Sequence, residues 1–295
     1  MEKSITVFTP TYNRKHTIYK CYESLLRQTS KDFTWLIIDD GSTDGTKELI
    51  NEWIKENKIE IRYILQENKG MHGAHNTAHI NMMTELCVCC DSDDYLSDNS
   101  IELILNNWNN IEDKSRFSGM IGIDANLEGK HLAKIPNELK ETTLFDLRFK
   151  FKLRGDYKLI YRTELIKEDL YPEFAGEKYL AVGYKYFNLD VNYKLSVIND
   201  VLCYVEYLED GGTSNKIKHY VKSPKGFSHY RKEMMKNSSL TSVKFRNAIH
   251  YVSSSTFEKN INFLSDSPAK VLTFLAIPMG IMLNIFIRLR FNFLK

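Results

Sequence analysis

The sequence lacks the features that mark secreted, disulfide-bonded or nucleic-acid-binding proteins. Its 295 residues contain only five cysteines, and the net charge is +2. The cysteines follow no C-x-x-C spacing and three of them lie in one apolar run, which favours buried free thiols in a reducing compartment over disulfides or zinc. A charge so near neutrality gives no electrostatic footprint for nucleic acid.

The first residues do not have the pattern of a secretory signal peptide. The stretch MEKSITVFTPTYN has neither a long apolar core nor a small-residue cleavage site, so we expect a cytoplasmic protein rather than a secreted one. The sequence shows no repeats and no low-complexity linker. Its length suits one large α/β domain, or a domain of ordinary size with an appendage.

Four short β-rich runs alternate with helical patterns over the first hundred residues. The run 4–8 is short and β-rich, and 86–90 is short and expected to be buried. The run 33–39 is too continuously apolar to be half-exposed, as buried parallel strands are, whereas 59–65 alternates with period two, which predicts a position nearer a sheet edge. Apolar residues at helical spacing occur around 18–26, around 49–54 and from 99. This order predicts a mostly parallel sheet with helices on both faces.

From about residue 116 the pattern changes. Strands are expected near 117–124 and 155–163, and 196–208 forms either a strand pair or one long strand. Farther on, the chain becomes helical, basic and aromatic. We therefore assign residues 1–215 to one α/β domain and residues 216–295 to a helical C-terminal region.

A polar segment follows each of the first four strands: TPTYNR, DDGSTD, QENKG and DSDD. In parallel α/β sheets, ligands bind outside the carboxyl ends of the strands. Because those ends lie along one edge of the sheet, the four segments are expected to converge on one rim. Their convergence predicts a ligand site there.

The segment CVCCDSDDYLSDNS concentrates carboxylates after a buried strand. Helix capping explains Asp98 but not the three acids before it. An EF-hand loop would need Gly where Leu96 stands, and nothing else supports an aspartyl nucleophile. A divalent-metal site that holds a diphosphate fits the spacing, because residues i and i+2 of an extended segment face the same way and Mg²⁺ takes one or two carboxylates. The expected ligands are Asp91 and Asp93.

The motifs TPTYNR, IIDDGSTDGT, NKGMHGAHN and CDSDDYL, in this order and spacing, closely resemble those of family 2 glycosyltransferases. The resemblance covers about residues 4–215 and implies the GT-A fold, a Rossmann-like, mostly parallel sheet flanked by helices, here with a helical tail. It implies inverting transfer from a nucleotide-diphospho-sugar, most commonly a UDP-sugar, with Mg²⁺ or Mn²⁺ as cofactor. The sugar would pass to a hydroxyl of a saccharide or lipid-linked acceptor, as in surface polysaccharide biosynthesis. The alternative is an inactive nucleotide-binding or scaffolding protein with the same fold.

The resemblance assigns roles to residues of each motif. Expected nucleotide contacts are Thr9, Pro10, Thr11, Tyr12, Arg14, Asp40, Lys69 and Asp91. Expected donor-sugar contacts are Asn76, Ser92 and Asp94, and the expected metal ligands are Asp91 and Asp93. Asp39, Ser42 and Asp44 are expected to hold the loop backbone and to cap the following helix. The three histidines of NKGMHGAHNTAH have helical spacing but no completing acid or cysteine, so a structural or surface role is expected rather than zinc binding.

Inverting transfer needs a general base outside the D-x-D pair, because the acceptor hydroxyl must lose its proton as it attacks the sugar. The segment YPEFAGEKYLAVGYKY is similar to the family segment that carries this acid, which makes Glu177 the expected base and Glu173 the runner-up. The alternative for Glu177 is a salt bridge to Lys178 or Arg154 at a helix start. The segment YLEDGGTSN resembles a loop that closes over the donor, and its candidate residues are Asp210, Gly211 and Ser214.

An apolar run, 271–287, precedes the basic stretch RLRFNFLK. As a straight helix this run would reach about 25 Å, short of the roughly 30 Å hydrocarbon core of a bilayer. We expect a helix kinked or broken at Pro278 that lies on the inner face of the cell membrane, with Arg288, Arg290 and Lys295 at anionic headgroups. The alternatives are packing on the domain or on a second subunit of a homo-oligomer, and a true membrane span.

Overall fold

The computed structural model describes residues 3–206 and 216–293, and the chain forms two compact units. Residues 1–171 and 192–206 make the first unit, and residues 172–191 join the C-terminal helices in the second. The units therefore divide the chain differently from the expected boundary at residue 215. The reason is local packing, because the helix inside 172–191 packs against a helix of the C-terminal region.

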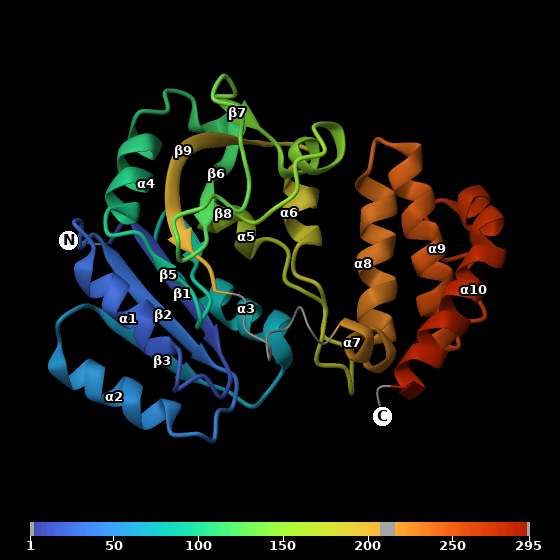
Figure 1. The fold of residues 1–295 in the computed structure, drawn as a ribbon, viewed down its shortest axis with the longest axis horizontal. Coiled ribbons are helices and arrows are strands. Elements are labelled where there is room, and N and C mark those ends of the chain that lie inside the picture. Colours follow the sequence, from blue (N-terminus) through green and yellow to red (C-terminus); the bar gives the residue numbers. More distant parts are fainter. Residues whose placement is uncertain (1–2, 207–215, 294–295) are drawn as a thin grey trace. The chain divides into compact units, whose positions relative to one another are not determined.

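The first unit is built on a nine-stranded sheet with the order β3-β2-β1-β4-β8-β6-β9-β5, and β7 pairs with β9 (Figure 1). The strands are β1 (Ile5–Thr11), β2 (Phe33–Asp39), β3 (Ile61–Leu65), β4 (Leu86–Cys89), β5 (Tyr95–Leu96), β6 (Phe117–Ala125), β7 (Glu141–Thr142), β8 (Tyr157–Arg162) and β9 (Lys194–Tyr204). The first four strands along the chain run parallel, and β3 is at the sheet edge, as predicted. Past β4 the sheet is mixed, because β8 pairs antiparallel with both β4 and β6. The mostly parallel arrangement therefore holds for the half that carries the four polar segments.

Helices cover both faces of this sheet. They are α1 (Ile18–Arg27), α2 (Thr46–Glu56), α3 (Gly70–Asn81), α4 (Ser100–Asn109) and α5 (Thr163–Lys167), with short helical turns η1 (Lys114–Arg116) and η2 (Asp146–Lys150). α1, α2 and α4 share one core with the sheet, in which the rings of Tyr22 and Trp53 stack at 4.2 Å. α3 covers the other face, where Phe8 of β1 lies edge-on to two of its histidines. Burial from both sides fits the almost complete burial of the residues of β1 and β2.

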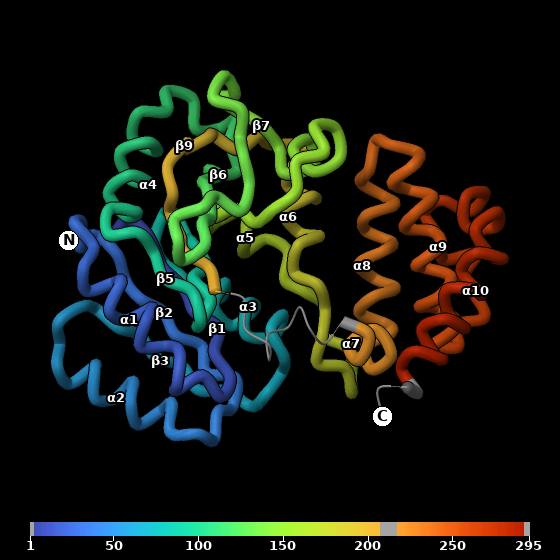
Figure 2. The backbone as a smooth tube through the Cα atoms, viewed as in Figure 1, coloured from blue at the N-terminus to red at the C-terminus, as the bar shows by residue number. Residues whose placement is uncertain are grey.

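The second unit is helical. Its helices are α6 (Tyr184–Leu189), α7 (Lys216–Lys222), α8 (Pro224–Asn237), α9 (Thr241–Glu258) and α10 (Lys270–Phe293). α8, α9 and α10 lie side by side (Figure 2). α10 approaches α9 closely, because a Cβ on Gly280 would lie 2.5 Å from the Cβ of Val252. The side chain of Asn284 adds a hydrogen bond to the carbonyl of Ser253 at 3.0 Å.

α10 differs from the expected tail helix in two respects. It runs as one helix through Pro278, so of the expected kink or break at that residue the break is wrong. It is also longer, since its 24 residues reach about 36 Å, enough by length to cross a membrane. Among the residues that the structure describes, it is the one helix that meets this test of length and apolar composition.

Candidate functional site

The segments that follow β1 and β2 lie side by side at the carboxyl ends of these two strands. The N–H of Asp40 donates to the carbonyl of Thr11 at 2.8 Å, which continues the pairing of the two strands. The N–H of Asn13 donates to Ser42 Oγ, and the N–H of Thr43 donates to Asn13 Oδ1, both at 2.8 Å. Asn13 has a φ of 53°, a backbone region that Asn tolerates better than most residues. These bonds join TPTYNR to DDGSTD.

The carboxylate of Asp39, at the end of β2, holds the loop that follows it. It is fully buried, and its oxygens accept hydrogen bonds from the N–H of Ser42 at 2.7 Å and the hydroxyl of Tyr63 at 2.8 Å. Asp44 accepts from the N–H of Thr46 at 3.1 Å, at the start of α2. Asp39 thus holds the loop backbone as expected, whereas the N-terminal cap of α2 is Gly45, so neither Ser42 nor Asp44 occupies the cap position expected of them.

Asp40 ties the third polar segment to the second. Its carboxylate accepts from Gln66 Nε2 at 2.7 Å and from the N–H groups of Lys69 and Gly70 at 2.8 Å each, at the start of α3. A negative charge at this helix N-terminus is favoured by the helix dipole. Asp40 is predicted to hydrogen-bond the nucleotide base. That bond would come in addition to the hydrogen bonds that its carboxylate already accepts from Gln66, Lys69 and Gly70.

The first polar segment presents one aromatic ring to solvent. Tyr12 is 50% exposed, so its ring is not part of the core and is available to stack on a base. Thr9 is fully buried, and its hydroxyl accepts a hydrogen bond from the indole of Trp35 at 2.9 Å. A ligand contact of Thr9 would therefore have to come from its backbone. Thr11 is buried, and Pro10 and Arg14 are half-buried.

The polar side chains of α3 mostly face the protein interior. His72, His75 and His79 are 1 to 2% exposed, which fits a structural role and excludes a surface one. The amide of Asn76 donates to the carbonyl of Tyr171 and accepts from its N–H, both at 2.8 Å. The predicted sugar contact of Asn76 would have to replace these bonds.

The D-x-D segment after β4 alternates between exposed and buried side chains. Asp91 is exposed and Asp93 is half-buried, whereas Ser92 and Asp94 are 6% and 5% exposed. The N–H of Asp94 donates to the carbonyl of Asp91 at 3.0 Å, which closes a turn. The two acids expected to bind metal therefore lie on the open side, and the two residues expected to contact the sugar point inward.

Asp98, at the end of the same acidic stretch, has a different role from the one expected. The N-terminal cap of α4 is Asn99, with no side-chain hydrogen bond, and Asp98 pairs with Arg27 at 3.0 Å. Capping by Asp98 is therefore a wrong prediction, because Asn99 occupies the cap position.

Asp91 and Asp93 fit a hard divalent cation by their chemistry. Carboxylate oxygens suit Mg²⁺ and Mn²⁺, which leave further positions to water and phosphate. Asp91 Oδ1 accepts one weak hydrogen bond, from Cys89 Sγ at 3.4 Å. Within residues 3–206 and 216–293, no three His, Cys, Asp or Glu side chains form a metal site by themselves. A cation at this pair would therefore rely on the diphosphate for further ligands.

Behind the D-x-D pair lies a buried charge cluster that the sequence patterns did not reveal. Lys158 of β8 is 7% exposed, and its Nζ donates to the carbonyl of Cys89 at 3.3 Å. Asp124 of β6 is 3% exposed, and its Oδ1 has no hydrogen-bond partner. Burial raises the pKa of Asp94 to about 8 and that of Asp124 to about 6, while Lys158 acts to lower both. One buried cation thus acts on two carboxylates and on the backbone that precedes Asp91.

The cluster escaped the sequence patterns because its members come from three distant segments. β8 reaches β4 through an antiparallel pairing, which places Lys158 next to the strand that carries the D-x-D pair. The one available signal was a lysine within the otherwise apolar core of GDYKLIYRT. A buried lysine in a strand needs a carboxylate nearby.

Glu177, in the second unit, binds the start of α8. Its two carboxylate oxygens accept from the N–H of Lys225 at 3.0 Å and the N–H of Gly226 at 2.9 Å. The carboxylate thus has a helix-start role, through backbone amides rather than a salt bridge. Each oxygen can accept a further hydrogen bond, so the cap orients the group without exhausting it. Glu173 is exposed. The expected loop residues Asp210, Gly211 and Ser214 lie outside the described residues.

Comparison with known proteins places the chain in a family. The model of Glycosyl transferase family 2 matches residues 6–169, more than half of the chain. The chain is 36% identical over 104 residues to Glycosyltransferase GlyA of Streptococcus pneumoniae serotype 4. It is 37% identical over 109 residues to the teichoic acid poly(glycerol phosphate) polymerase of Staphylococcus epidermidis. These matches cover 35% and 37% of this chain but only 15% of each relative.

Solved structures show the same fold. TarS 1-349 from S. aureus, in complex with UDP-GlcNAc, matches with a TM-score of 0.62 at 20% identity, over 94% of this chain and 80% of that one. The mannosyltransferase PcManGT from Pyrobaculum calidifontis, in complex with GDP-Man and Mn²⁺, matches with a TM-score of 0.55 at 14% identity, over 96% and 74%. With its mixed sheet and four strand-end segments, the chain has the GT-A fold and belongs to glycosyl transferase family 2.

Proposed function

We propose that this protein is an inverting glycosyltransferase that moves a sugar from a nucleotide-diphospho-sugar to a hydroxyl of a saccharide or lipid-linked acceptor. The observation that carries the proposal is the open pair Asp91 and Asp93 at the rim where four strand-end segments follow four parallel strands. A UDP-sugar is the first donor to test, because TarS was solved with UDP-GlcNAc. Surface polysaccharide synthesis is the proposed context, since relatives include a teichoic acid polymerase and chondroitin synthases.

The proposed reaction needs three tasks from the chain's own residues. Tyr12 offers a stacking surface for the base, and Asp91 with Asp93 would hold the cation. A bound Mg²⁺ or Mn²⁺ supplies positive charge to the leaving diphosphate. Glu177 takes the proton of the acceptor hydroxyl, whose oxygen bonds to C1 of the sugar while the bond from C1 to the diphosphate oxygen breaks. Attack from the face opposite the leaving group inverts C1.

The rival proposal is a nucleotide-binding protein without turnover. Two observations favour it: Glu177 caps α8, and the amide of Asn76 is bonded to the backbone of Tyr171. This rival predicts nucleotide binding without product. Both proposals place the nucleotide at the same strand-end rim. They differ in whether the sugar is then transferred to an acceptor.

We also propose that the second unit binds an anionic membrane surface through α10. Between the exposed basic residues at its two ends, Lys270 and Arg288 with Arg290, the exposed side of α10 is mostly apolar: Val271, Phe274, Leu275, Met279, Ile281, Met282, Ile285 and Phe286, with Leu289 beyond Arg288. The opposite side is buried, and it includes Thr273, Ala276 and Asn284. A helix with one face covered by protein and the other apolar suits the membrane interface better than a span.

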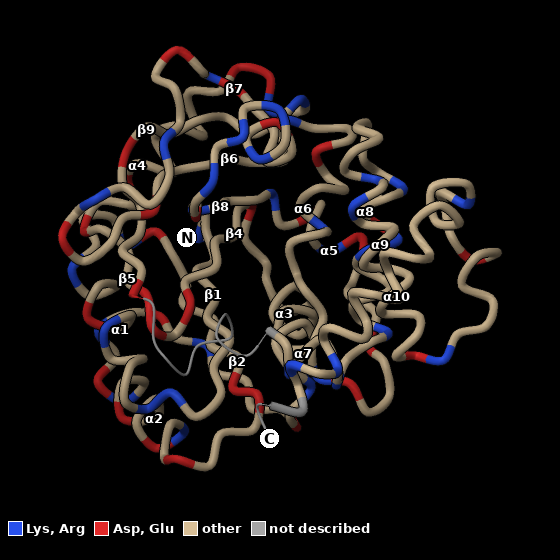
Figure 3. The backbone as a smooth tube through the Cα atoms, turned by 45° about the vertical axis from the view of Figure 1, so that its right-hand side comes forward, with Lys and Arg blue, Asp and Glu red and all other residues tan. Residues whose placement is uncertain are grey.

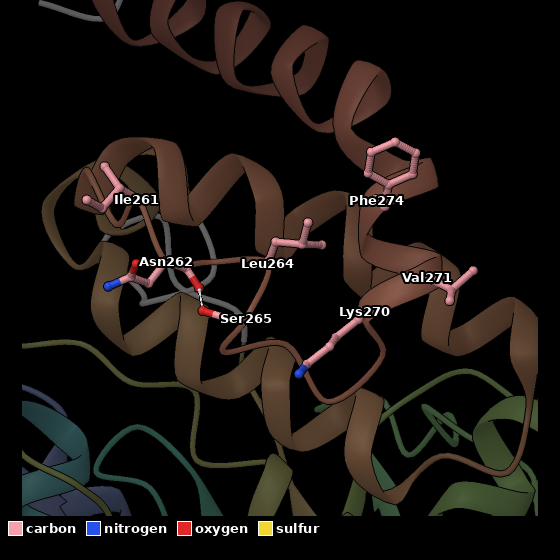
Figure 4. Close-up of a pocket in the computed structure, with 7 residues that line it drawn as sticks. All are labelled: Ile261, Asn262, Leu264, Ser265, Lys270, Val271 and Phe274. Atoms are coloured by element: carbon pink, nitrogen blue, oxygen red, sulfur yellow. Dashed lines mark hydrogen bonds between the residues drawn. The ribbon is translucent and has the colours of Figure 1, made fainter.

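The basic charge of the second unit and a groove beside α10 support binding to an anionic membrane surface. Residues 216–293 contain thirteen Lys and Arg but three Asp and Glu, and Lys and Arg recur along α7 and α8 (Figure 3). A groove of about 680 Å³ opens beside the start of α10, lined by the apolar residues Ile261, Leu264, Val271 and Phe274 and by the polar residues Asn262, Ser265 and Lys270 (Figure 4). Basic side chains beside an apolar face match headgroups beside acyl chains.

A transfer assay with stereochemical readout tests the proposed activity. The full chain is incubated with Mn²⁺, a panel of α-linked UDP- and GDP-sugars, and saccharide or lipid-linked acceptors, and the anomeric protons of the product are followed by NMR. The proposal predicts a β-linked product from an α-linked donor. A product with retained configuration contradicts the inverting mechanism, and metal-dependent nucleotide binding without any product supports the rival.

A further inference from the structure

The paired helices α8 and α9 hold a guanidinium group that has no acid partner among residues 3–206 and 216–293. Arg231 of α8 donates from Nη1 to Asn247 Oδ1 of α9 at 2.9 Å, and its Cζ lies 4.8 Å from the ring centre of Tyr230. Its Nε is buried and has no hydrogen-bond acceptor. The charges that act on this guanidinium come from tyrosines and from Arg246, and no carboxylate is among them. A charge held among helices without a counter-ion is costly, so the position calls for an anion.

Two more buried polar atoms without partners lie on the same pair of helices. They are Ser228 Oγ on α8 and His250 Nδ1 on α9. Residues three apart on a helix share a face, so Ser228 lies beside Arg231 and His250 lies beside Asn247. A guanidinium N–H and a hydroxyl are donors, and an imidazole nitrogen can become one. The three atoms together offer hydrogen bonds to an oxyanion.

Two arginines, Arg231 and Arg246, act on His250. Burial and the charges of Arg231 and Arg246 lower the pKa of His250 to about 3. Two acids of the same unit have other partners, since Glu233 accepts from Asn188 Nδ2 at 3.3 Å and Glu177 caps α8. The hydroxyl of Tyr220 donates to the carbonyl of His250 at 2.9 Å, which fixes the backbone beside the imidazole.

We propose that Arg231, Ser228 and His250 form an anion subsite that binds a phosphate ester of the acceptor. Guanidinium groups match the geometry of phosphate oxygens, and the three donors suit the several oxygens of a phosphate better than the two of a carboxylate. The inference rests on the proposed function only in naming the acceptor as the source of the phosphate. A soluble sugar phosphate and a lipid phosphodiester share this chemistry, and the test separates them.

Binding is measured on the full chain with defined probes. The imidazole signals of the wild type are followed by NMR against pH, with and without glycerol 3-phosphate, and affinity is measured by calorimetry. We expect saturable binding and a rise in the pKa of His250, because an adjacent anion favours the imidazolium. Vesicles of phosphatidylglycerol, with phosphatidylcholine vesicles as the reference, form the second arm. A response to glycerol 3-phosphate assigns a soluble phosphate, and a response to phosphatidylglycerol vesicles alone assigns a lipid phosphodiester.

A matched pair of variants locates the subsite. Arg231→Met should weaken binding about tenfold or more, the effect of losing a charge-assisted hydrogen bond. Lys236→Met removes the same charge from an exposed position of α8 and should leave glycerol 3-phosphate binding unchanged. The wild-type titration can refute the proposal by itself, even if the Arg231→Met variant folds poorly. If His250 responds to neither probe, or both variants bind alike, the subsite is refuted. Donor binding with Mn²⁺, measured in parallel, shows separately whether the proposed activity fails.

Discussion

The Nζ of Lys158 donates to the carbonyl of Cys89 at 3.3 Å, two residues before the first acid of the D-x-D pair. This bond joins β8 to the end of β4 at the place where Asp91 emerges. The same buried ammonium faces Asp94 and Asp124, whose side chains are 5% and 3% exposed. The acidic rim therefore depends on a cation supplied from a strand some seventy residues later in the chain.

Replacing Lys158 with Met should lower both stability and metal-dependent donor affinity. The change leaves buried carboxylates without their cation, at a cost of about 1–3 kcal/mol in the free energy of unfolding. Lys130→Met, at an exposed position, is the matched control. Thermal unfolding and calorimetry with Mn²⁺ measure the two effects. The double variant Lys158→Met/Asp124→Asn should recover part of the stability, and a double variant less stable than the single one would contradict this account.

Gln substitutions at the two candidate bases separate capping from catalysis. Glu177→Gln keeps a side-chain oxygen at the start of α8 but cannot take a proton, so transfer should fall about 10²- to 10⁴-fold with donor affinity unchanged. Glu173→Gln, at an exposed position in the same segment, should transfer normally. Transfer rates and donor calorimetry are the measurements. If Glu177→Gln retains near wild-type turnover while Glu173→Gln loses it, the base is Glu173.

His250 should make the protein sensitive to acid. Its pKa is lowered to about 3 in the folded chain by burial, Arg231 and Arg246, and returns to about 6.5 on unfolding. Between these values the unfolded state binds one more proton, so stability rises with pH by up to about 1.4 kcal/mol per unit and is lost as pH falls below 6.5. Urea midpoints of wild type and His250→Gln measure the effect. The variant should show a shallower dependence between pH 4 and 6, and equal slopes would show that His250 is not responsible.

A charge in the middle of the apolar side of α10 should abolish membrane binding. Met282 is 63% exposed at the centre of that side, so Met282→Glu should reduce partition into phosphatidylglycerol vesicles about tenfold or more while the helix stays packed on α9. Ser242→Glu places the same charge on an exposed position of α9. Vesicle co-sedimentation is the measurement. A self-associated protein whose dimer is broken by Met282→Glu, with no vesicle binding, would instead assign the apolar side to a second copy.

The sequence was informative where local pattern decides structure. The runs at 33–39 and 59–65 form β2 and the edge strand β3 because their apolar periodicity matches burial on two faces or on one. The expectation that Asp91 and Asp93 share a side assumed an extended segment, whereas the structure has a turn there, closed by the N–H of Asp94 on the carbonyl of Asp91 at 3.0 Å.

It was uninformative where a partner lies far along the chain. The cap that Glu177 provides requires α8, which starts some fifty residues later, and the cluster at Lys158 requires an antiparallel pairing that no periodicity encodes. Pro278 suggested a break in the tail helix. The packing of α10 along α9 instead supports an unbroken helix, and tertiary contacts commonly override such a local signal.

The most direct test of the account is calorimetric binding of UDP- and GDP-sugars, with and without Mn²⁺, to wild type and to Asp91→Asn/Asp93→Asn. The control is Asp98→Asn, which removes an acid of the same stretch that pairs with Arg27 outside the rim. We predict donor binding that requires Mn²⁺, weakens about tenfold or more in the double variant, and is unchanged in the control. Metal-independent binding, or equal affinity of wild type and the double variant, would contradict the account.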